Sequence, residues 1–217
     1  MTPGTAIAGF LGPLAIVALL RWRYGVTAPS RGLIGAFVAG AAGAFLALVV
    51  EEYLWPRLGG VFSTAWGDVF RAFVLIALTE ETIKLSLIHA RGSDAKDPSY
   101  GAFVIAAAAV GAGFAACENL LYLHTYGPDV LWIRLVTATP FHIFNAVLAA
   151  WAIARHLVGG RMEWTAAALT LSVVAHGLYD YALISAPVGN SHFLLALALV
   201  SMVALAILRR LRPVPQV

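Results

Sequence analysis

The sequence predicts an all-α membrane protein, a polytopic bundle of about seven transmembrane helices. Of its 217 residues, 61% are hydrophobic and only 12% are charged, whereas soluble domains average about 25% charged residues. The apolar residues also gather into runs of about 20, the length that a helix needs to cross a bilayer. We therefore expect one transmembrane domain over residues 1–217 and a multi-pass protein of the cell membrane.

Short polar connectors, several of them containing Pro or Gly, separate the expected spans, and no stretch reads as a soluble domain. The first run lacks the basic start and small-residue cleavage site of a signal peptide, so we expect it to be retained as a helix. The seven apolar runs fall at residues 4–20, 32–54, 66–89, 100–123, 130–154, 164–186 and 191–208.

Loop Lys and Arg residues predict the orientation, because they accumulate on the cytoplasmic side of short loops. Arg57 is the one basic residue in the loops of the other side. This asymmetry predicts an outside N-terminus and a cytoplasmic C-terminus. It also accounts for the net charge of +3, so the lipid bilayer is an expected partner and nucleic acid is not. The ten basic residues on the predicted cytoplasmic side are Arg21, Arg23, Arg31, Arg91, Lys96, Arg155, Arg161, Arg209, Arg210 and Arg212.

Ionisable side chains inside the expected spans are the candidate functional residues, since each costs at least about 2.5 kcal/mol to insert. At about 1.5 Å of rise per residue, Glu80, His142 and His176 lie about 15 to 18 Å deep. A hydrocarbon core about 30 Å thick places them near its middle. We expect one polar site in the middle to outer half of the bilayer, built from Glu80, Glu81, Lys84, Glu118, Asn119, His142, Asn145, His176 and Asp180.

Helical spacing indicates how some of these residues pair, because positions three or four apart share a face. Lys84 can neutralise Glu80 or Glu81 and leave the other carboxylate free. His176 and Asp180 are four apart, a spacing at which a carboxylate can orient an imidazole. Carboxylates and imidazoles around a water suit hydrolysis, and they also suit zinc binding. The sequence contains neither H-E-x-x-H nor G-x-S-x-G, so the usual zinc-helix and serine-hydrolase motifs are absent.

Four motifs carry these residues in order along the chain: EETIK (80–84), FAACENLLY (114–122), RLVTATPFH (134–142) and HGLYD (176–180). The ordered set resembles the PrsW family of intramembrane proteases. That family looks related to the CAAX-protease and bacteriocin-processing superfamily and to the APH-1 subunit of gamma-secretase. The resemblance covers about residues 66–186, which we expect to form a catalytic four-helix core. It implies a glutamate-dependent hydrolase that cleaves membrane-anchored proteins, with an anti-sigma factor as the substrate suggested by PrsW.

The resemblance also implies roles for individual residues. Glu80 and Glu81 match the paired glutamates that activate water in the superfamily. His176 and Asp180 match its last His-x-x-x-Asn/Asp motif, which is expected to polarise the scissile carbonyl. Glu118 stands where CAAX proteases carry a histidine, so the water-binding geometry of that superfamily need not hold here.

Our leading hypothesis makes Glu80 the general base, with Glu81 held by Lys84. The two imidazoles would bind the oxyanion or a metal, and Glu118 and Asp180 would orient them. The sequence leaves the cofactor open, and it favours direct activation of water because no ligand pair has the spacing of a known zinc helix. If a metal is bound, zinc is expected, and the candidate ligands are His142, His176, Glu81 and Glu118. The expected catalytic residues are Glu80, Glu81, Lys84, Glu118, His142, His176 and Asp180.

Two other functions use the same residues. A proton- or cation-coupled transporter would employ buried Glu, Lys and His as a relay, although the chain shows no internal repeat of the kind many transporters carry. A non-catalytic scaffold, as the APH-1 resemblance allows, would not require Glu80.

Overall fold

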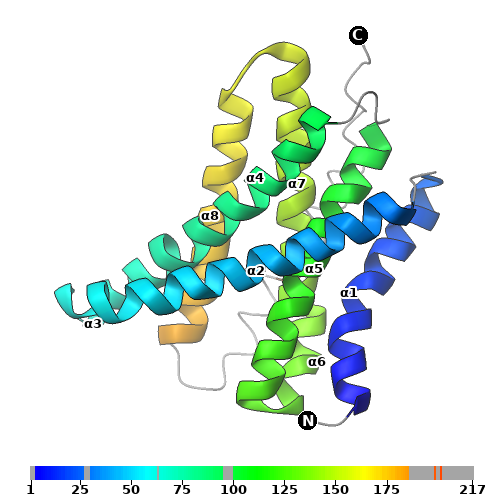
Figure 1. Ribbon diagram of the computed structural model, residues 1–217. Helices are drawn as coiled ribbons and strands as arrows, with labels where there is room; N and C mark the ends of the chain where they lie inside the picture. Colours follow the sequence, from blue (N-terminus) through cyan, green and yellow to red (C-terminus); the bar gives the residue numbers. More distant parts are fainter. Residues whose placement is uncertain are drawn as a thin grey trace.

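The computed structural model describes residues 3–26, 30–62, 64–94 and 100–185, together with Ala198 and Ser201. These residues form helices and turns, and no strand occurs among them (Figure 1). The chain is therefore all-α over the part described. The helices are α1 (Pro3–Tyr24), α2 (Ser30–Leu58), α3 (Thr64–Val69), α4 (Thr79–Asp94), α5 (Tyr100–Tyr126), α6 (Pro128–Val136), α7 (Ala138–Gly159) and α8 (Glu163–Ser185), with a 3₁₀ turn η1 (Gly59–Val61) and a π-helical segment η2 (Phe70–Leu78).

Five stretches of the described chain are long and apolar enough to cross a membrane. They confirm the prediction of a helical protein that crosses the membrane several times. The expected span 66–89 is not among them: α3, η2 and α4 cover it, but it carries more Asp, Glu, Lys and Arg side chains than an ordinary apolar span. The expected span 191–208 lies outside the described residues apart from Ala198 and Ser201, so the count of seven stays a prediction. The five stretches are Pro3–Arg23, Ser30–Val61, Tyr100–Tyr126, Pro128–Gly159 and Glu163–Ile184.

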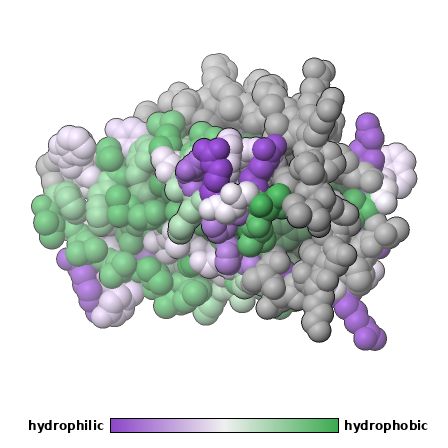
Figure 2. All heavy atoms as spheres, turned by 90° about the horizontal axis from the view of Figure 1, so that it is seen from above, coloured by the Kyte–Doolittle hydropathy of each residue, from purple (hydrophilic) through white to green (hydrophobic). Residues whose placement is uncertain are grey.

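Hydrophobic residues also cover the flanks of the bundle. Seen from the end where α7 turns into α8, hydrophilic residues gather near the middle and hydrophobic ones occupy much of the described periphery (Figure 2). On α2, Ile34, Val38 and Phe45 are each more than half exposed. Such a surface is costly in water and favourable in lipid.

Helix α5 is the centre of the packing, with α1 and α2 on one side and α7 on the other, and α2 crosses it obliquely (Figure 1). Glycine permits the close crossings. A Cβ on Gly40 would collide with the backbone of Val110, and one on Gly113 with that of Phe37. Small residues let helix backbones approach in this way when apolar burial alone gives no advantage over lipid.

The segment that carries the first motif is helical from Thr64 to Asp94, but its middle part, η2, has π geometry. Phe73 of η2 packs so closely on α8 that a Cβ on Gly177 would collide with its ring. Single π turns are frequently found at functional sites. Here the π segment ends at Leu78, two residues before Glu80.

The long stretch from Pro128 to Gly159 is interrupted at Thr137, where α6 ends and α7 begins. Pro140 lacks the N–H that would continue the helical hydrogen bonds back to Val136, which favours a break at this point. The interruption lies between Arg134 and His142, so the two ends of the third motif stand on different helices.

Candidate active site

Glu81 on α4 holds three hydrogen-bond donors on one carboxylate oxygen. Its Oε1 accepts from Lys84 Nζ at 2.6 Å, from His176 Nδ1 at 2.7 Å and from Asn145 Nδ2 at 3.2 Å. All four side chains are buried. A carboxylate bound in this way is well compensated, and it ties α4 to α7 and α8.

Glu80, one position earlier, is buried but much less engaged. Its Oε2 has no hydrogen-bond partner, although Lys84 Nζ lies 3.6 Å away, His176 Nε2 3.7 Å away and His142 Nδ1 3.9 Å away. Asp180 Oδ2 is likewise buried without a hydrogen bond and lies 3.3 Å from His176 Nε2. Glu80 Oε2 and Asp180 Oδ2 thus leave two buried acceptors beside His176 Nε2 that a hydrogen-bond donor such as water would satisfy.

His142 has both ring nitrogens engaged. Lys84 Nζ lies 3.0 Å from Nδ1, and because an ammonium group can only donate, Nδ1 must accept. Nε2 therefore carries the hydrogen atom and donates a hydrogen bond to Glu118 Oε2 at 3.0 Å. Arg134 Nη2 also donates to that oxygen, at 2.5 Å, and Phe114 stacks on the imidazole with ring centroids 5.6 Å apart. The ring is thus fixed in place and in tautomer.

Asn119 connects this part of the site to α1. Its Oδ1 accepts from Arg134 Nε at 3.0 Å, and its Nδ2 lies 3.0 Å from Thr139 Oγ1 and 3.4 Å from the carbonyl oxygen of Gly9. That carbonyl would normally accept the N–H four residues later, which is Pro13 and has none. A proline in the first helix thereby frees an acceptor for a buried amide in the site.

The cluster contains more carboxyl groups than side-chain cations. Burying unpaired charge is costly, so the cluster favours holding one or more protons on its imidazoles or carboxyl groups. His176 is the ring most surrounded by carboxylates, with Glu81, Asp180 and Glu80 at 2.7, 3.3 and 3.7 Å. The carboxyl groups are Glu80, Glu81, Glu118 and Asp180, and the cations are Lys84 and Arg134.

Glu80, His142 and His176 form a group that could hold a metal ion, since one ligand atom of each lies within 4.8 Å of the others. Zinc commonly takes three such protein ligands and a water. Lys84 Nζ, however, lies 3.0 Å from His142 Nδ1 and 3.6 Å from Glu80 Oε2. A cation therefore already stands beside two of the three ligand atoms.

Comparison with known proteins identifies the family. The model for PrsW family intramembrane metalloproteases matches residues 28–208. The chain belongs to the PrsW family. Protease PrsW from Bacillus subtilis (strain 168) is 25% identical over 148 residues, which cover 64% of this chain and 62% of that relative. The match thus spans less than two thirds of the relative's length. No solved structure matches the chain.

Family membership and the apolar helices together show a multi-pass protein of the cell membrane. They do not favour the transporter or scaffold alternatives. In this PrsW-family chain, the structure brings together every residue that the sequence analysis placed in the site. Of the metal candidates proposed from sequence, Glu81 and Glu118 lie outside the group with metal-like spacing, and Glu80 takes their place.

Two residues near the site were not assigned a role from sequence. Arg134 lies inside the expected span 130–154, and it is the ion-pair partner of Glu118. Glu51 lies near the end of the expected span 32–54, and its Oε1 is buried. The rule that intramembrane charges mark functional positions would have found the first. The second sits so near a helix end that sequence position alone suggests exposure.

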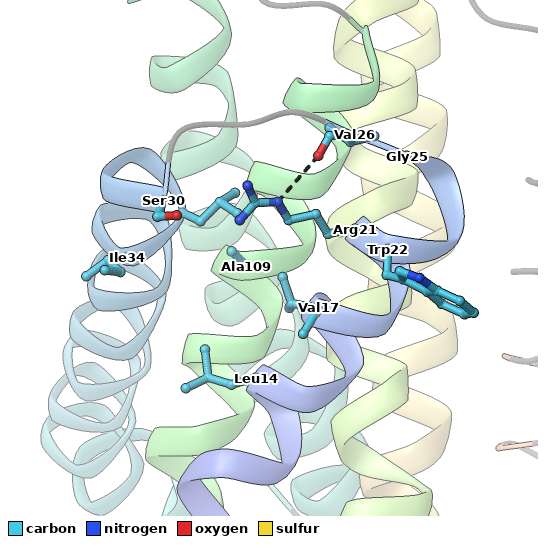
Figure 3. A pocket seen from close by; sticks show the side chains of 11 residues that line it. Leu14, Val17, Arg21, Trp22, Gly25, Val26, Ser30, Ile34 and Ala109 are labelled. Atoms are coloured by element: carbon cyan, nitrogen blue, oxygen red, sulfur yellow. Dashed lines mark hydrogen bonds between the residues drawn. The ribbon is translucent and has the colours of Figure 1, made fainter.

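A separate cavity of about 660 Å³ lies between α1, α2 and α5 (Figure 3). Leu14, Val17 and Ile34 line it together with Arg21, whose Nε donates to the carbonyl oxygen of Val26 at 3.4 Å. The cavity contains none of the residues of the charged cluster. We therefore do not assign this cavity as the active site, despite its size.

Proposed function

We propose that this chain is an intramembrane endopeptidase that hydrolyses peptide bonds of membrane-anchored proteins. One observation carries the proposal: a buried carboxylate oxygen without a partner, Glu80 Oε2, lies 3.7 Å from His176 Nε2 in a chain of the PrsW family. A general base must be within hydrogen-bonding reach of the water it activates. A water molecule lying to one side of this pair, within about 3 Å of both atoms, would meet that condition.

In the proposed reaction, Glu80 takes a proton from water as the water oxygen attacks the carbonyl carbon. His176 in its protonated form donates from Nε2 to the developing oxyanion, a contribution worth about 100- to 1000-fold in rate for a single donor. Glu80 then returns the proton to the leaving nitrogen as the C–N bond breaks. Glu81 holds the Nδ1 side of His176 and so fixes the direction in which Nε2 points.

His142 is a positioning residue in this scheme, because both of its nitrogens are already bound. Glu118 and Arg134 hold it from one side and Lys84 from the other. The same Lys84 argues against a metal at this group: its ammonium repels a divalent ion and occupies the lone pair of Nδ1. A zinc ion, if held by Glu80, His142 and His176, would supply Lewis acidity and a more acidic water. We propose that the chain does not use one, in contrast to the family description.

The proposal is tested by reconstituting the purified protein in liposomes with a panel of single-span substrates, including a membrane-anchored anti-sigma factor. We expect fragments cut at or near the membrane, detected by mass spectrometry, from at least one substrate. The Glu80→Gln protein should yield none. Cleavage that persists at the wild-type rate in Glu80→Gln would overturn the assignment.

A further inference from the structure

Glu51 on α2 carries a buried carboxylate oxygen that no described hydrogen bond satisfies. The adjacent Glu52 is exposed, because successive residues of a helix point about 100° apart. Glu51 itself is half-buried. Its buried oxygen calls for an explanation, since buried polar atoms are nearly always hydrogen-bonded to protein or to water.

Glu51 lies close enough to the candidate active site for its charge to act on three of the site's carboxyl groups, those of Glu118, Asp180 and Glu80. Among the described residues, the buried carboxylate oxygens without a hydrogen bond belong to Glu51, Glu80 and Asp180, which lie on α2, α4 and α8. The charged groups that act on Glu51 or feel its charge are Arg71 from η2, Glu80 from α4, Glu118 from α5, Asp180 from α8 and Glu52 from its own helix.

The charged neighbour of opposite sign does not satisfy this oxygen. Arg71 lies over the ring of Trp55, with its guanidinium carbon 5.0 Å from the ring centroid, and Glu51 Oε1 remains without a partner. A carboxylate beside other carboxylates can be satisfied only by a donor. Water is such a donor, and buried waters typically make about three hydrogen bonds to groups of this kind.

We infer that Glu51 anchors the waters that supply the hydrolytic site. The inference rests on the proposed function, because each peptide bond hydrolysed consumes one water and the site lies within the bilayer. Glu51 is seven residues before the end of α2 at Leu58, about 10 Å along the helix. Waters entering near that end would pass Glu51 and reach Asp180 and then Glu80.

Radiolytic hydroxyl labelling tests this route without any substrate, because X-rays generate radicals from ordered waters and these oxidise adjacent side chains. Tyr179 is the reporter: it is buried and precedes Asp180 in the chain. We expect labelling of Tyr179 to fall about fivefold to tenfold in Glu51→Leu, the change that one lost hydrogen bond of typical strength produces. Glu51→Gln, which keeps a polar group, should retain most of the labelling, and Glu52→Leu is the matched control.

The cleavage rate should follow the order of the Tyr179 labelling: lowest in Glu51→Leu, and close to wild type in Glu51→Gln and Glu52→Leu. In Glu51→Leu we expect a lower kcat and a nearly unchanged KM. Thermal melting of each variant separates this effect from unfolding, and the Gln variant keeps the test valid if the Leu variant folds poorly. Equal Tyr179 labelling in Glu51→Gln, Glu51→Leu and the wild type would overturn the inference. So would an equal drop in Glu52→Leu. If Tyr179 labelling drops only in Glu51→Leu but the wild-type protein cleaves no substrate, the proposed function is contradicted and the water route is still supported.

Discussion

At the scale of single residues, the paired glutamates have different surroundings although they are adjacent. Glu81 Oε1 receives donors from three other side chains, while Glu80 Oε2 receives none. A carboxylate whose lone pairs are already engaged is a poor proton acceptor, and one without partners is available for water. This contrast assigns the anchoring role to Glu81 and the reactive role to Glu80 in our proposal.

The contrast predicts opposite effects for two substitutions. Glu80→Gln is nearly isosteric and removes no hydrogen bond, so we expect cleavage to disappear while the melting temperature changes little. Lys84→Met leaves Glu81 without its cation, and breaking a buried pair costs about 3 to 5 kcal/mol. We expect that variant to lose both stability and activity. Thermal melting and cleavage assays on the same preparations measure the two effects, and equal losses of folded protein would instead indicate a purely structural network.

The position of Lys84 also predicts the response to chelators. Because its ammonium lies 3.0 Å from His142 Nδ1, we expect a chelator-washed preparation to cleave at the rate of the untreated protein. Metal analysis should find far less than one zinc per chain. Stoichiometric zinc that is lost on changing His176 to Ala, together with activity restored by zinc, would refute the metal-free mechanism.

At the scale of helices, the spacing between α5 and α7 decides whether the site forms. A Cβ on Gly111 would lie 2.6 Å from the carbonyl oxygen of His142 and 2.9 Å from the Cα of Ile143. The backbone that carries the second motif thus touches the backbone that carries the third. Any increase in this spacing moves His142 away from Glu118, its partner on α5.

Gly111→Ala should therefore be destabilising, by about 1 to 3 kcal/mol for an overpacked contact, and should lower cleavage further by displacing His142. Gly32→Ala on α2 is the control, since nothing lies within 4 Å of a Cβ built there. Alanine at an open helical position should be neutral or stabilise by up to about 1 kcal/mol. Equal melting temperatures for the two variants would show that α5 and α7 tolerate separation.

Helix-level features also mark where sequence analysis stops. An intramembrane charge must face other protein, so the convergence of Glu80, Glu118 and His176 could be predicted from composition alone. Residue spacing gives the depth of each group but not the rotation and tilt of its helix. The contacts from Lys84 to His142 and from Arg134 to Glu118 depend on those rotations. The π geometry of η2 likewise has no sequence signature strong enough to predict it. Pro13 does mark the freed carbonyl of Gly9, but not the Asn119 amide that this carbonyl meets.

At the scale of the whole molecule, orientation remains a prediction from the loop charges. Exposed residues flank the α6–α7 stretch at both ends: Tyr126, the last residue of α5, before it and Met162 after it. If the N-terminus is outside, these two residues lie on opposite sides of the membrane, with Met162 in the cytoplasm. The polar site then lies toward the outer leaflet.

Cysteine labelling tests that arrangement with little disturbance, because Cys117 is the single native cysteine. In a Cys117→Ala background, we expect Tyr126→Cys to react with a membrane-impermeant thiol reagent in intact cells. Met162→Cys should react only after the cells are opened. The reverse pattern would invert the topology and place the site near the cytoplasmic leaflet.

The π-helical segment has a consequence for how the first motif could have arisen and how it can be altered. A π-helix has more residues per turn than an α-helix, so it holds an additional residue without a longer helix. Segment η2 therefore sets the rotation about the helix axis between Phe73, which packs on Gly177, and Glu80. Deleting one residue from η2 would turn everything beyond it by about 100°. Glu80 would then rotate away from His176 while every side chain of the site remained in the chain. The reactive geometry is thus encoded in a residue count as well as in residue identities.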